Sequence, residues 1–206
     1  MNEENLIETN ISNPFYTADL IKVDARLDLY IYGEIKDIDN PETIKLINMI
    51  EMTDAPIVVT ISSYGGSMYS SFAIYNALKS KQSTSSITTI ANGIVSSGAA
   101  LIYMAGNERW SYDYTTFMVH GAQVESYVSG SMRNLEADMT FTNMMYKRFV
   151  MEAFKDKFTD EEISDICDKS LNKYLDTKEA MERGIVTHLI VSDDVSEEES
   201  GQIPHG

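Results

Sequence analysis

The chain has 206 residues, of which 43% are hydrophobic and 23% charged, a composition typical of one globular domain and unlike that of disordered, collagenous or membrane chains. Against 16 Lys and Arg stand 32 Asp and Glu, and the formal net charge of -16 disfavours nucleic acid and anionic membranes as partners. The acidic start lacks the basic and apolar regions of a secretory signal, so we expect a cytoplasmic protein. The only cysteine, Cys167, excludes an intramolecular disulfide and a multi-cysteine zinc site.

Strands and helices are predicted to alternate through the first half of the chain. Runs of β-branched and aromatic residues predict strands, and Asn40 followed by Pro41 predicts the start of a helix. The glycine-containing segments 63–67 and 92–93 predict turns that end the strands before them. The expected elements are strands over residues 29–35, 57–61 and 86–91, and helices over residues 41–52, from the first turn to about residue 81, and 96–105.

The second half continues the same alternation. A strand over residues 114–120 precedes a long helix over about 131–157, whose apolar face is rich in methionine. Two capping boxes, Thr159 to Glu162 and Asp176 to Glu179, mark helix starts, and a last strand follows at 185–191. This order predicts an α/β fold with mainly parallel strands. We expect one domain over residues 1–191 and a disordered acidic tail at 192–206.

The chemistry-bearing residues follow three of these strands. Ser97 would stand at the start of a helix, where unpaired N–H groups and the helix dipole favour developing negative charge. His120 ends a strand, and the Gly65-Gly66 turn can present amides to a ligand. Open α/β sheets collect their sites at the carboxyl edge. Each feature alone is more typical of a helix cap or a tight turn than of a site, and only their combination suggests acyl transfer by serine.

Five segments, in this order, resemble the ClpP peptidase family. They are Ile31-Tyr32-Gly33-Glu34-Ile35, Ile61-Ser62-Ser63-Tyr64-Gly65-Gly66-Ser67, Gly93-Ile94-Val95-Ser96-Ser97-Gly98-Ala99, Phe117-Met118-Val119-His120 and Glu179-Ala180-Met181-Glu182-Arg183-Gly184-Ile185-Val186. The resemblance covers about residues 29–191. It implies a ClpP/crotonase-like fold of repeated ββα units with a long protruding handle helix, here about residues 123–157.

The resemblance also implies an activity, a self-compartmentalising serine endopeptidase that hydrolyses unfolded proteins or peptides without a metal or cofactor. It implies homo-oligomeric heptameric rings, stacked in pairs and fed by an AAA+ unfoldase. Carried over position by position, the site would comprise the nucleophile Ser97, the base His120, the oxyanion amides of Gly66 and Gly98, and the substrate-groove candidates Tyr64 and Gly65.

Three departures from the family pattern bear on function. Tyr64 stands where the family has proline, so the substrate groove can differ in rigidity. Asn172 stands at the position of the catalytic aspartate, and Asp168 and Asp176 are nearby alternatives. Asparagine can orient an imidazole but does not supply the charge that stabilises imidazolium. The segment 13–26 is unlike the family's pore-gating start, which makes a conventional unfoldase partner less secure.

Three other functions compete with an active peptidase. Asn172 could mark a catalytically weak or inactive ring subunit with a structural or regulatory role, in a cell or a virus. Acyl-CoA chemistry on the related crotonase scaffold would leave the serine and histidine unexplained. A Ser-Lys dyad like that of a signal-peptide peptidase is disfavoured by the suitable His120 and the missing membrane anchor.

Overall fold

The computed structural model describes residues 26–123 and 131–191 of the chain. Its elements, in chain order, are β1 Leu27–Ile35, α1 Pro41–Met52, β2 Ile57–Gly66, α2 Met68–Lys81, β3 Ile87–Ser96, α3 Gly98–Tyr103, β4 Glu108–Tyr112, β5 Thr116–Val119, α4 Met132–Ala153, α5 Asp160–Cys167, β6 Lys173–Asp176, α6 Thr177–Glu182 and β7 His188–Ile190. The expected tail at 192–206, the start of the chain and part of the expected handle lie outside the described residues.

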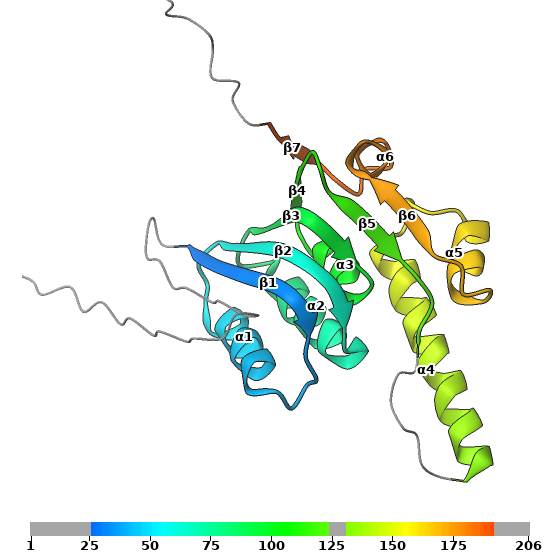
Figure 1. The fold of residues 1–206 in the computed structure, drawn as a ribbon. Helices are drawn as coiled ribbons and strands as arrows, with labels where there is room; N and C mark the ends of the chain where they lie inside the picture. Colours follow the sequence, from blue (N-terminus) through cyan, green and yellow to red (C-terminus); the bar gives the residue numbers. More distant parts are fainter. Residues whose placement is uncertain (1–25, 124–130, 192–206) are drawn as a thin grey trace, which may run out of the picture.

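A largely parallel sheet forms the centre of the molecule (Figure 1). Its main path runs β1-β2-β3-β4-β7, and every pair along it is parallel. β3 pairs with β2 along one edge and with two strands along the other, β4 beside its first half and β5 beside its last residues. β6 then adds to β5 in antiparallel orientation. The predicted α/β class is therefore confirmed.

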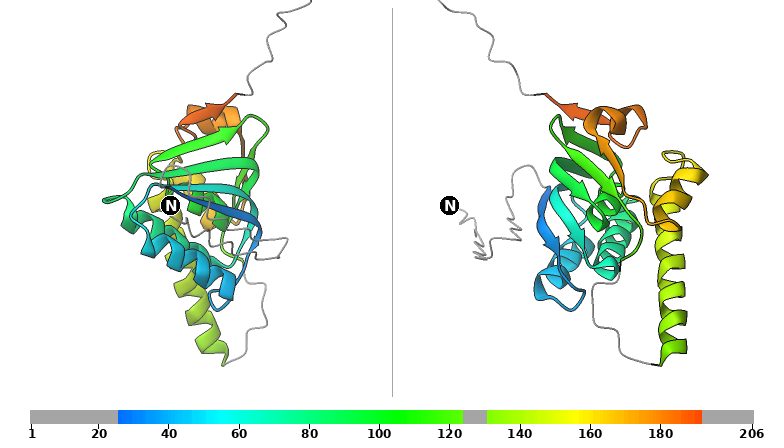
Figure 2. Two further views of the ribbon diagram at one scale, coloured as in Figure 1. Left: turned by 90° about the vertical axis from the view of Figure 1, so that its left-hand side faces the viewer. Right: turned by 45° about the vertical axis from the view of Figure 1, so that its right-hand side comes forward.

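The helices α1, α2 and α3 lie together against the sheet (Figures 1 and 2). Helix α1 begins as predicted, because the Asn40 side chain accepts a hydrogen bond from the Glu42 amide and Pro41 occupies the first helical position. Apolar side chains from the strands and helices form one continuous core. Among the described residues, no helix is both long enough and apolar enough to cross a membrane.

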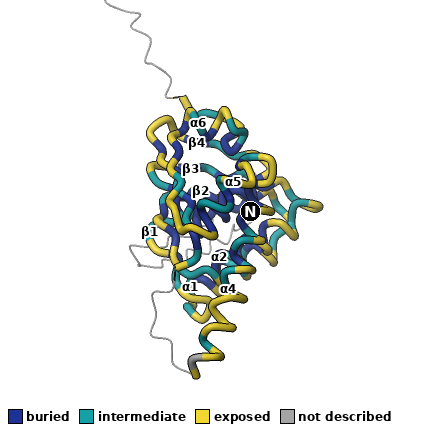
Figure 3. The backbone as a smooth tube through the Cα atoms, turned by 90° about the vertical axis from the view of Figure 1, so that its right-hand side faces the viewer, coloured by how far each residue is buried: buried dark blue, intermediate teal, exposed yellow. Residues whose placement is uncertain are grey.

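Helix α4 projects beyond the body (Figure 2). Its projecting part is coloured exposed or half-buried in Figure 3, in agreement with the described residues before Tyr146. Tyr146, Val150 and Ala153 are buried. The spacing of these buried residues matches one face of a helix. Only the C-terminal part of α4 therefore contributes to the core.

Several predicted boundaries were wrong. β2 does not stop before the Gly65-Gly66 segment but includes it, because positive φ angles of 94° and 149° let the two glycines continue pairing with β1. In the same way β3 passes Gly93, at φ 77°, and continues to Ser96. The expected handle helix ends at Ala153 instead of residue 157. β4 and β6 had not been predicted.

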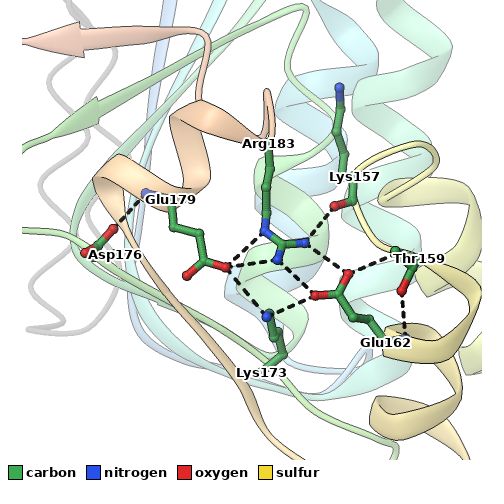
Figure 4. A network of polar contacts seen from close by, with 7 residues as sticks. All are labelled: Lys157, Thr159, Glu162, Lys173, Asp176, Glu179 and Arg183. Atoms are coloured by element: carbon green, nitrogen blue, oxygen red, sulfur yellow. Dashed lines mark hydrogen bonds and ion pairs between the residues drawn. The ribbon is translucent and has the colours of Figure 1, made fainter.

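A network of charged side chains joins α5, β6 and α6 (Figure 4). The Arg183 guanidinium donates to both carboxylate oxygens of Glu162, at 3.0 and 2.9 Å, and also pairs with Glu179. Lys173 lies 3.0 Å from Glu162 and 3.6 Å from Glu179. These contacts hold the first residue of β6 against two helices.

Candidate active site

Ser97 occupies a strained turn between β3 and α3. Its φ of 56° and ψ of -127° lie where residues with a side chain are rarely found, which costs about 1–3 kcal/mol. Such a strand-to-helix turn presents the serine side chain above the sheet, as in the nucleophile elbow of α/β-hydrolases. The Ser97 amide donates to the carbonyl of Met118 at 2.7 Å, which ties the turn to β5.

The imidazole of His120 lies directly beside this serine. His120 follows the last residue of β5, and the pairing of Ser96 with Met118 brings the ends of β3 and β5 together. The His120 Nε2 atom is 2.8 Å from the Ser97 Oγ atom. This distance is within hydrogen-bond reach of a general base and its nucleophile. Both residues are only partly buried, so a substrate can reach them.

The glycine segment of β2 packs against the Ser97 turn. A Cβ atom on Gly65 would lie 2.7 Å from the Ser97 Cβ atom and 3.0 Å from the Gly98 nitrogen. The buried Ser63 hydroxyl holds this segment, since it donates to the Gly33 carbonyl at 2.5 Å and accepts from the Gly65 amide at 3.0 Å. A bare backbone at residue 65 is therefore required for the close approach.

The two candidate oxyanion donors are backbone amides on the two segments that meet here, Gly66 in β2 and Gly98 in α3. Gly98 begins α3 beside Ser97, where the first amides of a helix have no partner within the helix. It is buried against Ser71, with no room for a side chain. Gly66 ends β2, where a Cβ atom would clash with the backbone of Ile35. The fold thus places both backbones at the same edge of the sheet as Ser97.

Asn172 lies near the histidine, but its side chain bonds elsewhere. The antiparallel register pairs Val119 with Lys173, and continuing it by one residue places Asn172 opposite His120. Asn172 is exposed, and its Nδ2 atom donates to the Tyr174 hydroxyl at 3.3 Å. The structure thus brings Ser97 and His120 into contact, whereas Asn172 lies near these two residues and bonds to Tyr174.

The two alternative carboxylates are engaged in other contacts. Asp168 accepts from Lys147 and, at 3.1 Å, from the Ser164 hydroxyl, and the Lys147 hydrogen bond lowers the pKa of Asp168. Asp176 caps α6 by accepting from the Glu179 amide at 2.7 Å. Both carboxylates therefore have structural roles at helix ends.

The structure also reveals contacts that motif reading missed. Tyr64, the groove candidate, is 72% exposed and leaves its side chain available to a ligand. Tyr146, from α4, donates to the His120 backbone carbonyl at 2.8 Å. No sequence signal marked Tyr146, because it is one apolar position among many on a helix. The described residues contain no group of three or more side chains suited to hold a metal ion.

Comparison with known proteins assigns the family. The sequence profile described as Clp protease matches residues 19–193. The chain belongs to the Clp protease family. ATP-dependent Clp protease proteolytic subunit 2 of Pseudomonas aeruginosa is 26% identical over 171 residues, covering 80% of this chain and 81% of that protein. The proteolytic subunit 2 of Borreliella burgdorferi is 29% identical over 168 residues, covering 79% and 81%.

A solved structure supports the Clp protease assignment. An asparagine-to-aspartate variant of ClpP1 from Listeria monocytogenes superimposes with a TM-score of 0.60 at 25% identity. The match covers 81% of this chain and 92% of the Listeria chain. The predicted ClpP-like fold and the family resemblance are thereby confirmed, and the described Ser97 and His120 geometry belongs to a chain with a Clp protease fold.

Proposed function

We propose that this chain is a serine endopeptidase that hydrolyses peptide bonds of unfolded proteins or peptides. The single observation that carries the proposal is the 2.8 Å contact between the Ser97 Oγ and His120 Nε2 atoms. The strained turn at Ser97 supports it, because a serine that only capped a helix would not need a φ of 56°. Membership of the Clp protease family agrees with this chemistry.

The reaction would proceed through an acyl-enzyme. His120 takes the Ser97 proton while Oγ attacks the scissile carbonyl carbon, and the resulting oxyanion accepts hydrogen bonds from the Gly66 and Gly98 amides. The tetrahedral intermediate collapses, the C–N bond breaks and His120 returns the proton to the leaving amine. Water then attacks the ester with His120 as base, which releases the acid and restores Ser97.

Asn172 is proposed as the group that orients His120. The support is the β5–β6 register, which brings Asn172 opposite His120. In this role Asn172 would exchange its bond with Tyr174 for one with the imidazole. A neutral amide stabilises imidazolium less than a carboxylate does, so we expect slow turnover.

The assembly we propose is a ring of copies of this chain. The relatives are named as subunits of ATP-dependent proteases. For this chain we infer stacked heptameric homo-oligomeric rings, fed by an AAA+ unfoldase, that enclose the sites and so protect cytoplasmic proteins. The peptidase domain would span residues 1–191, followed by the acidic tail 192–206.

A second candidate is a ring subunit with weak or no catalysis. The observation in its favour is that the Asn172 side chain bonds to Tyr174 in this structure. Such a subunit would keep the fold and the ring while contributing little hydrolysis.

Covalent labelling distinguishes the two functions. We expect a fluorophosphonate probe to modify the assembled wild-type chain at Ser97, and to spare the Ser97→Ala and His120→Ala chains. A related ClpP peptidase under the same conditions is the positive control. Intact rings that stay unlabelled while the control reacts would overturn the peptidase proposal in favour of the inactive subunit.

A further inference from the structure

The backbone of His120 is held by the helix that carries the handle. The Tyr146 hydroxyl donates to the His120 carbonyl oxygen at 2.8 Å. Tyr146 is 4% exposed, and burial raises its pKa, so the phenol stays protonated and remains a donor at neutral pH. The hydrogen bond joins α4 to the end of β5, 26 residues earlier in the chain.

A second contact fixes the same stretch of backbone from α5. A Cβ atom on Gly121 would lie 2.7 Å from the Ile166 carbonyl oxygen, so the backbone after His120 packs tightly on the last turn of α5. The next residue of α4, Lys147, pairs with Asp168 at the end of α5. His120 and its neighbour are therefore fixed between two helices that are also joined to each other.

Tyr146 is the point at which the handle meets the body. The described α4 residues before Tyr146 are exposed or half-buried, and among the residues whose burial is described it is the first buried one on the helix. A shift of α4 would act on the His120 carbonyl through this one hydrogen bond. The imidazole must stay in line with Ser97 for proton transfer, and small displacements of catalytic groups reduce rates strongly.

We propose that Tyr146 is a positioning residue, which keeps His120 in line with Ser97 by its hydrogen bond to the His120 backbone carbonyl. The inference rests on the proposed peptidase function. It assigns no chemical step to the phenol, whose effect is transmitted through the backbone of the base. Loss of the hydroxyl should therefore slow catalysis without changing substrate binding.

The test compares two buried tyrosines in the assembled full-length chain. The Tyr103 side chain is also buried, and its hydroxyl donates to the Trp110 carbonyl at 3.1 Å. Trp110 belongs to β4, so this hydrogen bond does not hold the His120 backbone. We expect Tyr146→Phe to lower kcat for a fluorogenic peptide about tenfold, with KM and the Tyr103→Phe control each changed less than about twofold. Replacing Tyr146 with 4-aminophenylalanine, which keeps an N–H donor, should restore kcat.

The outcomes separate this inference from the proposed function. Equal kcat values for Tyr146→Phe and Tyr103→Phe, with Ser97 labelling intact, would overturn the positioning role alone. A Tyr146→Phe chain that loses its assembly, or melts far below Tyr103→Phe, would also overturn it, because the hydroxyl would then serve the fold. A wild-type chain that reacts with neither peptide nor probe would overturn both.

Discussion

At the scale of single residues, the site requires a glycine, without a side chain, at position 65. Gly65 approaches the Ser97 turn so closely that a Cβ atom would lie 2.7 Å from the Ser97 Cβ atom and 2.8 Å from the Ser96 carbonyl oxygen. The same Cβ atom would lie beside the Gly98 amide, the proposed oxyanion donor. Residue 65 thus controls both the position of Ser97, the proposed nucleophile, and the space beside the proposed oxyanion donor.

We predict that Gly65→Ala lowers peptide hydrolysis at least about 100-fold, because the methyl group must displace the Ser97 turn. Gly93→Ala is the matched control: Gly93 also has a positive φ, of 77°, but its nearest contact for a Cβ atom is 3.7 Å away. Backbone strain alone should leave the Gly93→Ala rate much closer to wild type. Similar losses in both variants would show that strain, and not the contact with Ser97, governs activity.

The charge at residue 172 provides the second prediction at this scale. We predict that Asn172→Asp raises kcat by about tenfold or more, because a carboxylate stabilises the imidazolium that forms on His120. In the standard serine-protease triad, the opposite change from Asp to Asn lowers kcat by about 10⁴. The measurement is peptide turnover by Asn172→Asp and Asn172→Ala rings of verified size. No gain in the first together with no loss in the second would refute the assigned role.

Some site residues could be predicted from sequence and others could not, for a physical reason. Ser97 and His120 each follow a parallel strand, and the ends of such strands meet at one edge of a sheet, so their proximity can be anticipated. The Tyr146 contact is different, because it needs the position of α4 relative to β5. The orientation of Asn172 likewise depends on an exposed side chain that has Tyr174 as a competing partner.

At the scale of elements, the charged network of Figure 4 keeps β6 in register. Glu162 accepts hydrogen bonds from Arg183, pairs with Lys173 and caps its own helix through the Thr159 amide. Hydrogen bonds from Arg183, and to a smaller extent from the Thr159 amide and Lys173, lower the pKa of Glu162 from 4.5 to about 2. Since Lys173 directly follows Asn172, this network also fixes the backbone opposite His120.

We predict that Glu162→Gln destabilises the fold by about 1–2 kcal/mol at pH 7, after the shift in pKa is reduced for solvent screening. Because the folded-state pKa is lowered, the stabilisation is complete above the ordinary pKa of 4.5 and is lost as pH falls toward about 2. Glutamine keeps a capping acceptor, so the variant tests the charge. The difference from wild type should therefore shrink on acidification from pH 5.

Denaturant unfolding at several pH values measures this effect. Glu161→Gln is the control, since Glu161 lies on the same turn and is exposed. A Glu162→Gln difference that stays constant down to pH 2.5 would contradict the charge argument.

The strands that sequence reading missed are short and depend on neighbours. β6 has four residues, and its place in the sheet comes from pairing with β5 and from the contacts of Lys173. β4 carries Glu, Arg and Ser among its five residues and extends the sheet by pairing with β3. Local propensity is weak in such segments, and tertiary pairing decides their structure. Long apolar strands and capped helices were recognisable because their patterns are local.

At the scale of the whole molecule, helix α4 leaves an apolar surface without a partner in a single chain. Met139, Phe141 and Met144 are 52%, 60% and 55% exposed, and all three precede Tyr146 on the helix. Phe141 and Met144 also line a hollow there. Phe141 and Met144 are three residues apart and therefore lie on one side of the helix, and neighbouring large apolar side chains that are exposed are typical of interaction surfaces. In the proposed assembly, this surface lies between stacked rings.

We predict that Phe141→Glu separates the stacked rings, because the new carboxylate would be an unpaired charge in an apolar interface, which costs roughly several kcal/mol. Light scattering should then give about half the wild-type particle mass, as expected when one of two symmetric ring contacts is lost. Met52→Glu is the matched control, since Met52 is 87% exposed on α1, away from α4. An unchanged mass for Phe141→Glu would exclude this face from the ring contact. A separated ring that still labels at Ser97 would further show that the chemistry needs only one ring.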